Sequence, residues 1–157
     1  MKVALWMVGK TSFPYLKEGI QLYEKRLKHY LSFEHCVLPD IKNAKNLKEA
    51  QLKIKEGQLI LKKLKKEDTL ILLDENGKML TSVQFATFVE KQLHQSHKRI
   101  VFLIGGAYGF SEAVYQRSQR KLSLSKMTFS HQMVRLIFIE QLYRAMTILR
   151  NEPYHHR

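Results

Sequence analysis

The chain has 157 residues, of which 45% are hydrophobic and 26% are charged, and these values are typical of one soluble globular domain. Its single cysteine, Cys36, excludes a disulfide framework and a cysteine-based zinc site, and no apolar run approaches the roughly 18 residues of a membrane span. We therefore predict one cytoplasmic domain, residues 1–157, with no metal cofactor and no membrane contact.

The positive charge of the chain indicates a polyanionic partner. Lysine and arginine number 27 against 14 acidic residues, a formal net charge of +13, which favours nucleic acid or an anionic membrane as the partner. Segment 42–66 holds nine lysines and no arginine, whereas 101–157 holds six of the eight arginines. Because lysine is a mobile point charge and arginine makes planar bidentate contacts, we predict a diffuse electrostatic surface beside a more specific site. An ordinary solvated helix surface is the alternative explanation for the lysines.

The first half of the chain alternates strands and helices. In chain order, the pattern predicts a strand at 2–8, a helix at 14–30, a strand at 33–38 and a helix at 46–65. Pro14 suits the first turn of the first helix. In both helices the apolar residues recur at helical spacing, so each should bury one face.

The second half continues this alternation. The pattern predicts a strand at 69–74, a turn at 75–78, a helix at 81–94, a strand at 99–104, a glycine loop at 105–109, a helix at 112–118, a strand at 120–124 and a helix at 131–149. Thr81 and Gln84 have the spacing of a capping box. Because the strands are apolar on both faces, we predict an α/β fold with a mostly parallel sheet and helices on both faces.

The glycine loop is the first candidate site. Gly105, Gly106 and Gly109 follow a predicted strand and precede a helix, and ligand crevices lie at the carboxyl ends of parallel strands. The spacing fits neither the P-loop nor the dinucleotide-binding pattern. We therefore predict a ligand-binding loop of another kind, with a plain tight turn as the alternative.

Two further segments carry useful chemistry. Residues 124–131 combine hydroxyl, apolar and histidine side chains, which suits a pocket for an adenosine-like ligand, and His131 there is a candidate base or helix cap. The last helix is apolar nearly all round and favours packing against a second subunit, so we predict a homodimer. The tail, 151–157, has an aromatic ring and histidines suited to stacking on a base and contacting phosphate.

Several runs together resemble the RlmH family of SPOUT-type ribosomal RNA methyltransferases. They are I-G-G-x-x-G-F at 104–110, L-S-x-S-K-M-T-F-x-H-Q-M-x-R at 122–135, I-E-Q-x-Y-R-A at 139–145 and P-Y-H at 153–155. Shorter matches, V-G-K at 8–10, Y-E-K-R-L at 23–27 and E-G-Q at 56–58, extend the resemblance over the whole chain. One departure is Ser130, where the family usually carries proline before the histidine.

The resemblance implies a C-terminal trefoil knot, an obligate homodimer and S-adenosylmethionine as co-substrate. It also implies a substrate, a pseudouridine in 23S rRNA that is methylated at N3 within the assembled ribosome. The family pattern assigns cofactor contacts to Leu73, Gly105, Leu124, Ser125, Lys126, Met127, Thr128 and Phe129. A SPOUT-like enzyme for transfer RNA and a non-catalytic RNA- or ribosome-binding protein are the alternatives.

Methylation at N3 requires loss of a weakly acidic proton, and histidine is the natural general base near neutral pH. The candidate catalytic residues are His131, Arg135, Tyr154 and His155, with His156 as a rival base and Arg144 as a rival cation. In this hypothesis an arginine stabilises the imide anion or binds a flanking phosphate, and Tyr154 stacks on RNA.

Overall fold

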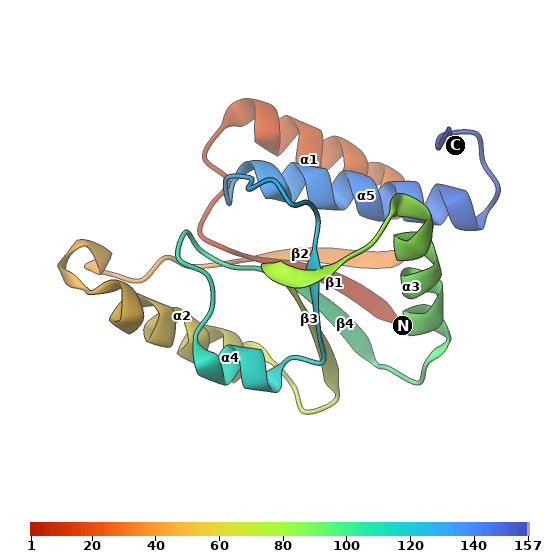
Figure 1. Ribbon diagram of the computed structural model, residues 1–157. Helices are drawn as coiled ribbons and strands as arrows, with labels where there is room; N and C mark the ends of the chain where they lie inside the picture. The colour runs from red at the N-terminus through yellow and green to blue at the C-terminus, as the bar shows by residue number, and fades with distance from the viewer. Residues whose placement is uncertain (157) are drawn as a thin grey trace.

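Five parallel strands form a single sheet in the computed structural model, which describes residues 1–156 (Figure 1). The strands are β1 (Lys2–Val8), β2 (Ser32–Leu38), β3 (Asp68–Met79), β4 (Arg99–Ile104) and β5 (Arg120–Ser123). Their order is β2-β1-β4-β3-β5, and every neighbouring pair is parallel. The predicted parallel α/β sheet is therefore confirmed.

Helices cover both faces of this sheet, as the sequence predicts. They are α1 (Pro14–Leu27), α2 (Glu49–Lys63), α3 (Ser82–His94), α4 (Glu112–Arg117) and α5 (Met133–Leu149), with a short 3₁₀ turn at Ala44–Asn46 before α2. Figure 1 shows α1, α3 and α5 together on one face, and α2 and α4 on the other. None of the helices in residues 1–156 is both long and apolar enough to cross a membrane.

The core lies on both sides of the sheet. Phe102 and Phe138 pack at 4.9 Å between ring centroids on the side of α1, α3 and α5, and Trp6 and Ile60 belong to the cluster on the other side. This two-sided burial explains why the strands read as continuous apolar runs. The predicted capping box is confirmed, since Gln84 N donates to Thr81 Oγ1 and Thr81 N donates to Gln84 Oε1.

The turn predicted at 75–78 is wrong, because β3 continues to Met79. Leu122 of β5 is in register with Leu73 and again with Lys78, so residues 74–77 bulge out and pass across β5. Gly77 lies at this crossing, where a Cβ atom would be 2.6 Å from backbone atoms of Leu122. The local sequence is typical of a turn, but pairing with a strand more than 40 residues later decides its conformation.

Replacing Gly77 by alanine is expected to destabilise the protein by about 3 kcal/mol, because the neighbouring backbone cannot rotate away as a side chain would. Urea unfolding monitored by circular dichroism measures this change. Asn76→Ala, at the exposed neighbouring position, is the matched control and should change stability by less than about 0.5 kcal/mol. Equal stability of the two variants would contradict the close crossing.

Candidate functional site

A pocket of about 530 Å³ lies at the carboxyl end of β4 and beside the bulge at residues 74–77 of β3. The glycine loop forms one wall, and the segment 122–131 between β5 and α5 forms another. This volume falls within the range of small-molecule sites. The glycine loop and the segment 124–131, each predicted separately to bind a ligand, thus form two walls of one cavity.

The glycine loop closes on itself at the edge of the pocket. Gly109 N donates to Gly106 O at 3.2 Å, and Gly109 has a φ of +84°, which favours glycine. At Gly105 a Cβ atom would lie 2.9 Å from the Phe110 ring, and at Gly106 it would lie 2.9 Å from Glu56 Oε2. The loop therefore depends on glycine both for its backbone conformation and for its close packing.

Side-chain hydrogen bonds shape the opposite wall. Ser123 Oγ donates to Ser125 O at 3.0 Å, and Ser125 Oγ accepts from Met127 N at 2.9 Å. Ser130 Oγ accepts from Met133 N at 3.0 Å, so the serine that departs from the family pattern holds the entry to α5. Met127 is 78% exposed and leaves an apolar side chain at the rim.

Seven of the eight residues expected to contact the cofactor line this pocket. They are Leu73, Gly105, Leu124, Ser125, Met127, Thr128 and Phe129. Lys126 is not among the lining residues, although its two neighbours are. The structure thus brings together three segments that are up to 56 residues apart in the sequence.

The pocket is acidic in a strongly basic protein. Glu49, Asp74 and Glu75 contribute carboxylates to it, and none of the described lining residues is lysine or arginine. Asp74 Oδ1 accepts from Asn76 N, but Asp74 Oδ2 is buried and has no hydrogen-bond partner. A buried carboxylate oxygen without a partner favours a ligand that carries a donor or a positive charge.

Sequence reasoning missed these acidic residues. Asp74 directly follows the apolar run of β3, as Gly105 follows that of β4, so its position at a strand end was a usable signal. Glu49 gave no such signal, because it reaches the pocket from α2. Burial, and then the nearby Asp74 carboxylate, raise the pKa of the Tyr115 hydroxyl in the same wall.

His131 lies in the turn before α5, at the edge of the pocket, and its side chain is exposed. Helix α5 begins at Met133, two residues later than predicted. Both roles expected for His131, a general base and a helix cap, stay predictions. Its imidazole is accessible from the pocket side, and its carbonyl accepts a hydrogen bond from Arg135 Nε at 3.2 Å.

The Arg135 side chain is fully buried, which does not favour the predicted contact with substrate. Its guanidinium donates to Val8 O at 2.7 Å, to Gly9 O at 2.8 Å and to Thr11 Oγ1 at 3.1 Å. Burial lowers the pKa of this guanidinium. Arg135 joins the end of β1 to the start of α5 and so acts as a positioning residue for the wall that carries His131.

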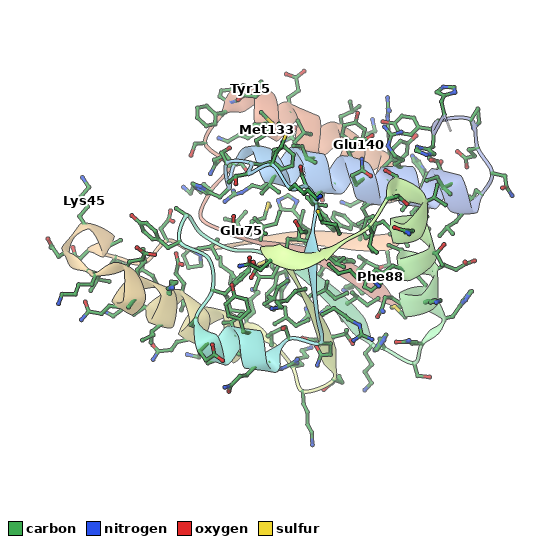
Figure 2. The ribbon with its side chains drawn as sticks, viewed as in Figure 1. Tyr15, Lys45, Glu75, Phe88, Met133 and Glu140 are labelled. Atoms are coloured by element: carbon green, nitrogen blue, oxygen red, sulfur yellow. The ribbon has the colours of Figure 1, made fainter. Side chains whose placement is uncertain are left out.

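The tail packs on α5, away from the pocket of its own chain. Tyr154 donates to Glu140 Oε1 at 2.9 Å and stands edge-on to the Tyr143 ring. Arg144 forms an i,i+4 ion pair with Glu140 at 2.6 Å and lies 3.0 Å from His155 Nδ1. Since α5 is about 25 Å long, the tail and the pocket lie at its opposite ends (Figures 1 and 2).

Fold and pocket together define an α/β protein with a small-molecule pocket between a glycine loop and the segment before its last helix. Residues 1–155 match the family described as "Predicted SPOUT methyltransferase", and the chain belongs to that family. The resemblance read from the sequence motifs is thereby confirmed.

The curated relatives cover essentially the whole chain. A protein of Parabacteroides distasonis is 64% identical over 156 residues, which are 99% of both chains. Proteins of Christiangramia forsetii and Flavobacterium johnsoniae are 55% and 57% identical over 157 residues, all of both chains. Each of these relatives is named ribosomal RNA large subunit methyltransferase H.

Proposed function

We propose that this protein transfers a methyl group from S-adenosylmethionine to N3 of a pseudouridine in 23S rRNA on the assembled ribosome. The pocket between the β3 bulge and the end of β4, in a SPOUT-family chain with rRNA methyltransferase relatives, carries this proposal. The proposal includes a cytoplasmic homodimer and the family's trefoil knot. The close passage of residues 74–77 across β5 supports the knot.

The chemistry of the pocket fits S-adenosylmethionine. Apolar side chains such as Leu73, Leu124 and Phe129 suit an adenine ring, and the unpartnered Asp74 oxygen suits a cationic or donor group. When bound, this molecule supplies an electrophilic methyl group on a sulfonium. The glycine loop permits close approach of a ligand to the backbone at Gly105.

The remaining task of the chain is to orient the uracil ring and accept its N3 proton. His131 is exposed at the pocket edge, and a neutral imidazole is a competent base near neutral pH. His155 and Tyr154 lie at the far end of α5, so their participation requires the tail of a second subunit. Exposed Phe13 and Tyr15 at the start of α1 offer apolar surface to such a subunit.

The first experiment is labelled methyl transfer from S-adenosylmethionine to ribosomes that lack this modification. Naked 23S rRNA and transfer RNA serve as the comparison substrates, and mass spectrometry identifies the product. We expect N3-methylpseudouridine only with assembled ribosomes. Label in transfer RNA would support the transfer RNA enzyme instead, and no label from folded protein would support a non-catalytic RNA-binding protein.

Deleting residues 153–157 is expected to abolish methylation while leaving the affinity for S-adenosylmethionine unchanged, because the tail lies outside the pocket of its own chain. Methyl transfer to ribosomes and titration calorimetry measure the two quantities. Tyr154→Phe, which keeps the ring against Tyr143, is the milder companion variant. Normal methylation by the truncated protein would show that the tail is not part of the catalytic site.

Asp74→Asn is expected to weaken S-adenosylmethionine about fivefold, roughly 1 kcal/mol, because a charge of the pocket that favours a cation is lost. S-adenosylhomocysteine, which lacks the sulfonium charge, should bind the variant nearly as well as the wild type. Calorimetry with both compounds checks this difference. An equal loss for both would show that Asp74 acts on a group that the two compounds share, such as the α-amino group, and not on the sulfonium.

A further inference from the structure

We propose that segment 42–55 is a docking surface for RNA phosphates beside the pocket. This segment, the lysine arm, contains Lys42, Lys45, Lys48, Lys53 and Lys55. The inference rests on the proposed function in taking rRNA as the substrate, and it assigns to this arm the attraction that brings the RNA to the site.

The lysine arm projects from the body of the protein. Figures 1 and 2 show the start of α2 and the loop before it extending beyond the sheet, with Lys45 at the far end. The buried residues of α2 are Glu56, Gly57 and Ile60, all in its second half. Gly57 packs closely against Ser111, which anchors this half of the helix to the start of α4. The first half is left free to contact a partner.

The charges of the arm are unpaired within residues 1–156. None of its five lysines forms an ion pair there, whereas Lys2, Lys28 and Lys98 each pair with a glutamate. Four of the five are exposed, and Lys53 is half-buried. The lysines therefore keep their full charge for a partner, instead of neutralising neighbouring acids.

The arm lies next to the pocket and has the opposite charge. Glu49, the first residue of α2, lines the pocket, and its neighbour Lys48 is one of the exposed lysines of the arm. An acidic pocket suits a cationic methyl donor but repels phosphate. Attraction of RNA must then come from groups outside the pocket, and mobile lysines contact phosphates without reading sequence.

RNA suits this surface better than a lipid membrane. A helix that lies in a membrane interface buries a broad apolar face, whereas Ile54 is the one large apolar side chain on α2 that is strongly exposed. Lys48 is the N-cap residue of α2, and Lys53 and Lys55 lie within the first half of this helix. Single positive charges spaced along an exposed segment suit a phosphate backbone.

The test compares two triple variants of the full-length protein that lose the same charge from the same region. The arm variant carries Lys45→Gln, Lys48→Gln and Lys55→Gln, which remove three of the five positive charges of the arm. The control carries Lys62→Gln, Lys65→Gln and Lys66→Gln, at the end of α2 and just after it. Affinity for unmodified ribosomes is measured over a series of KCl concentrations. The slope of log K against log [KCl] is negative. In the arm variant we expect it to become less steep by about 3, which is about 1 for each lysine removed. The control should retain the wild-type slope.

Kinetics supply a second readout. The arm variant should show a raised KM for ribosomes with unchanged kcat and unchanged affinity for S-adenosylmethionine. The assignment to the arm would be overturned if the arm variant and the wild type had equal slopes. It would also be overturned if the slope changed equally in the arm variant and the control variant. So would arm-dependent binding to anionic lipid vesicles with ribosome binding unaffected. Wild-type protein that binds ribosomes without methylating them would refute the proposed function, while the slopes would still decide the role of the arm.

Discussion

Replacing Gly105 by leucine is expected to eliminate measurable binding of S-adenosylmethionine. Gly105 follows β4 directly, and even a Cβ atom there would lie 2.9 Å from the ring of Phe110. A leucine side chain must displace that buried ring or enter the pocket, and either movement disrupts the wall opposite residues 124–129. We expect the affinity to fall more than about 100-fold, equivalent to about 2.7 kcal/mol.

Titration calorimetry of the Gly105→Leu protein measures this loss. Circular dichroism and a thermal melt establish that the sheet has formed, and Gly105→Ala should give an intermediate affinity because its single added carbon demands a smaller shift of Phe110. A folded Gly105→Leu protein with wild-type affinity would place the cofactor outside this pocket.

Replacing Arg135 by methionine is expected to destabilise the fold by about 3 to 5 kcal/mol. The change leaves the carbonyls of Val8 and Gly9 without their buried donor, and each unsatisfied polar group costs about 1 to 3 kcal/mol. Arg135→Lys should restore part of the lost stability, since a single ammonium cannot reproduce the guanidinium's spread of donors. Urea unfolding measures both variants.

Arg144→Met is the matched control for Arg135. Its guanidinium is partly exposed and pairs with Glu140 on the surface of the same helix, so its loss should cost about 1 kcal/mol or less. If Arg135→Met kept wild-type stability and lost only methyl transfer, the positioning role would be wrong and direct contact with substrate would have to be reconsidered.

The two arginines show where motif reading reaches its limit. Both stand in runs that match the family, and both are chemically able to bind an anion. The sequence shows that α5 is apolar nearly all round, but it does not show what the helix packs against. Arg135 meets the carbonyl groups at the end of β1, more than 120 residues earlier in the chain, and this packing turns a candidate substrate ligand into a buried support.

The pocket, too, has features that could be predicted from the sequence and features that could not. Glycine at 105 and the hydroxyl and apolar residues of 124–129 could be predicted, because a ligand crevice at a parallel strand end has a local signature. The acidic lining could not be predicted as a unit, since Glu49 reaches the pocket from α2, and Asp74 and Glu75 reach it from the bulge of β3.

The alternation of strands and helices, the parallel sheet and the family could all be predicted from the residues, because strand periodicity, capping and glycine spacing act over a few positions. The path of residues 74–79, the burial of Arg135 and the distance between the tail and the pocket of its own chain could not be predicted in this way. These features depend on contacts between residues 45 to more than 120 positions apart, and local propensity does not encode such contacts.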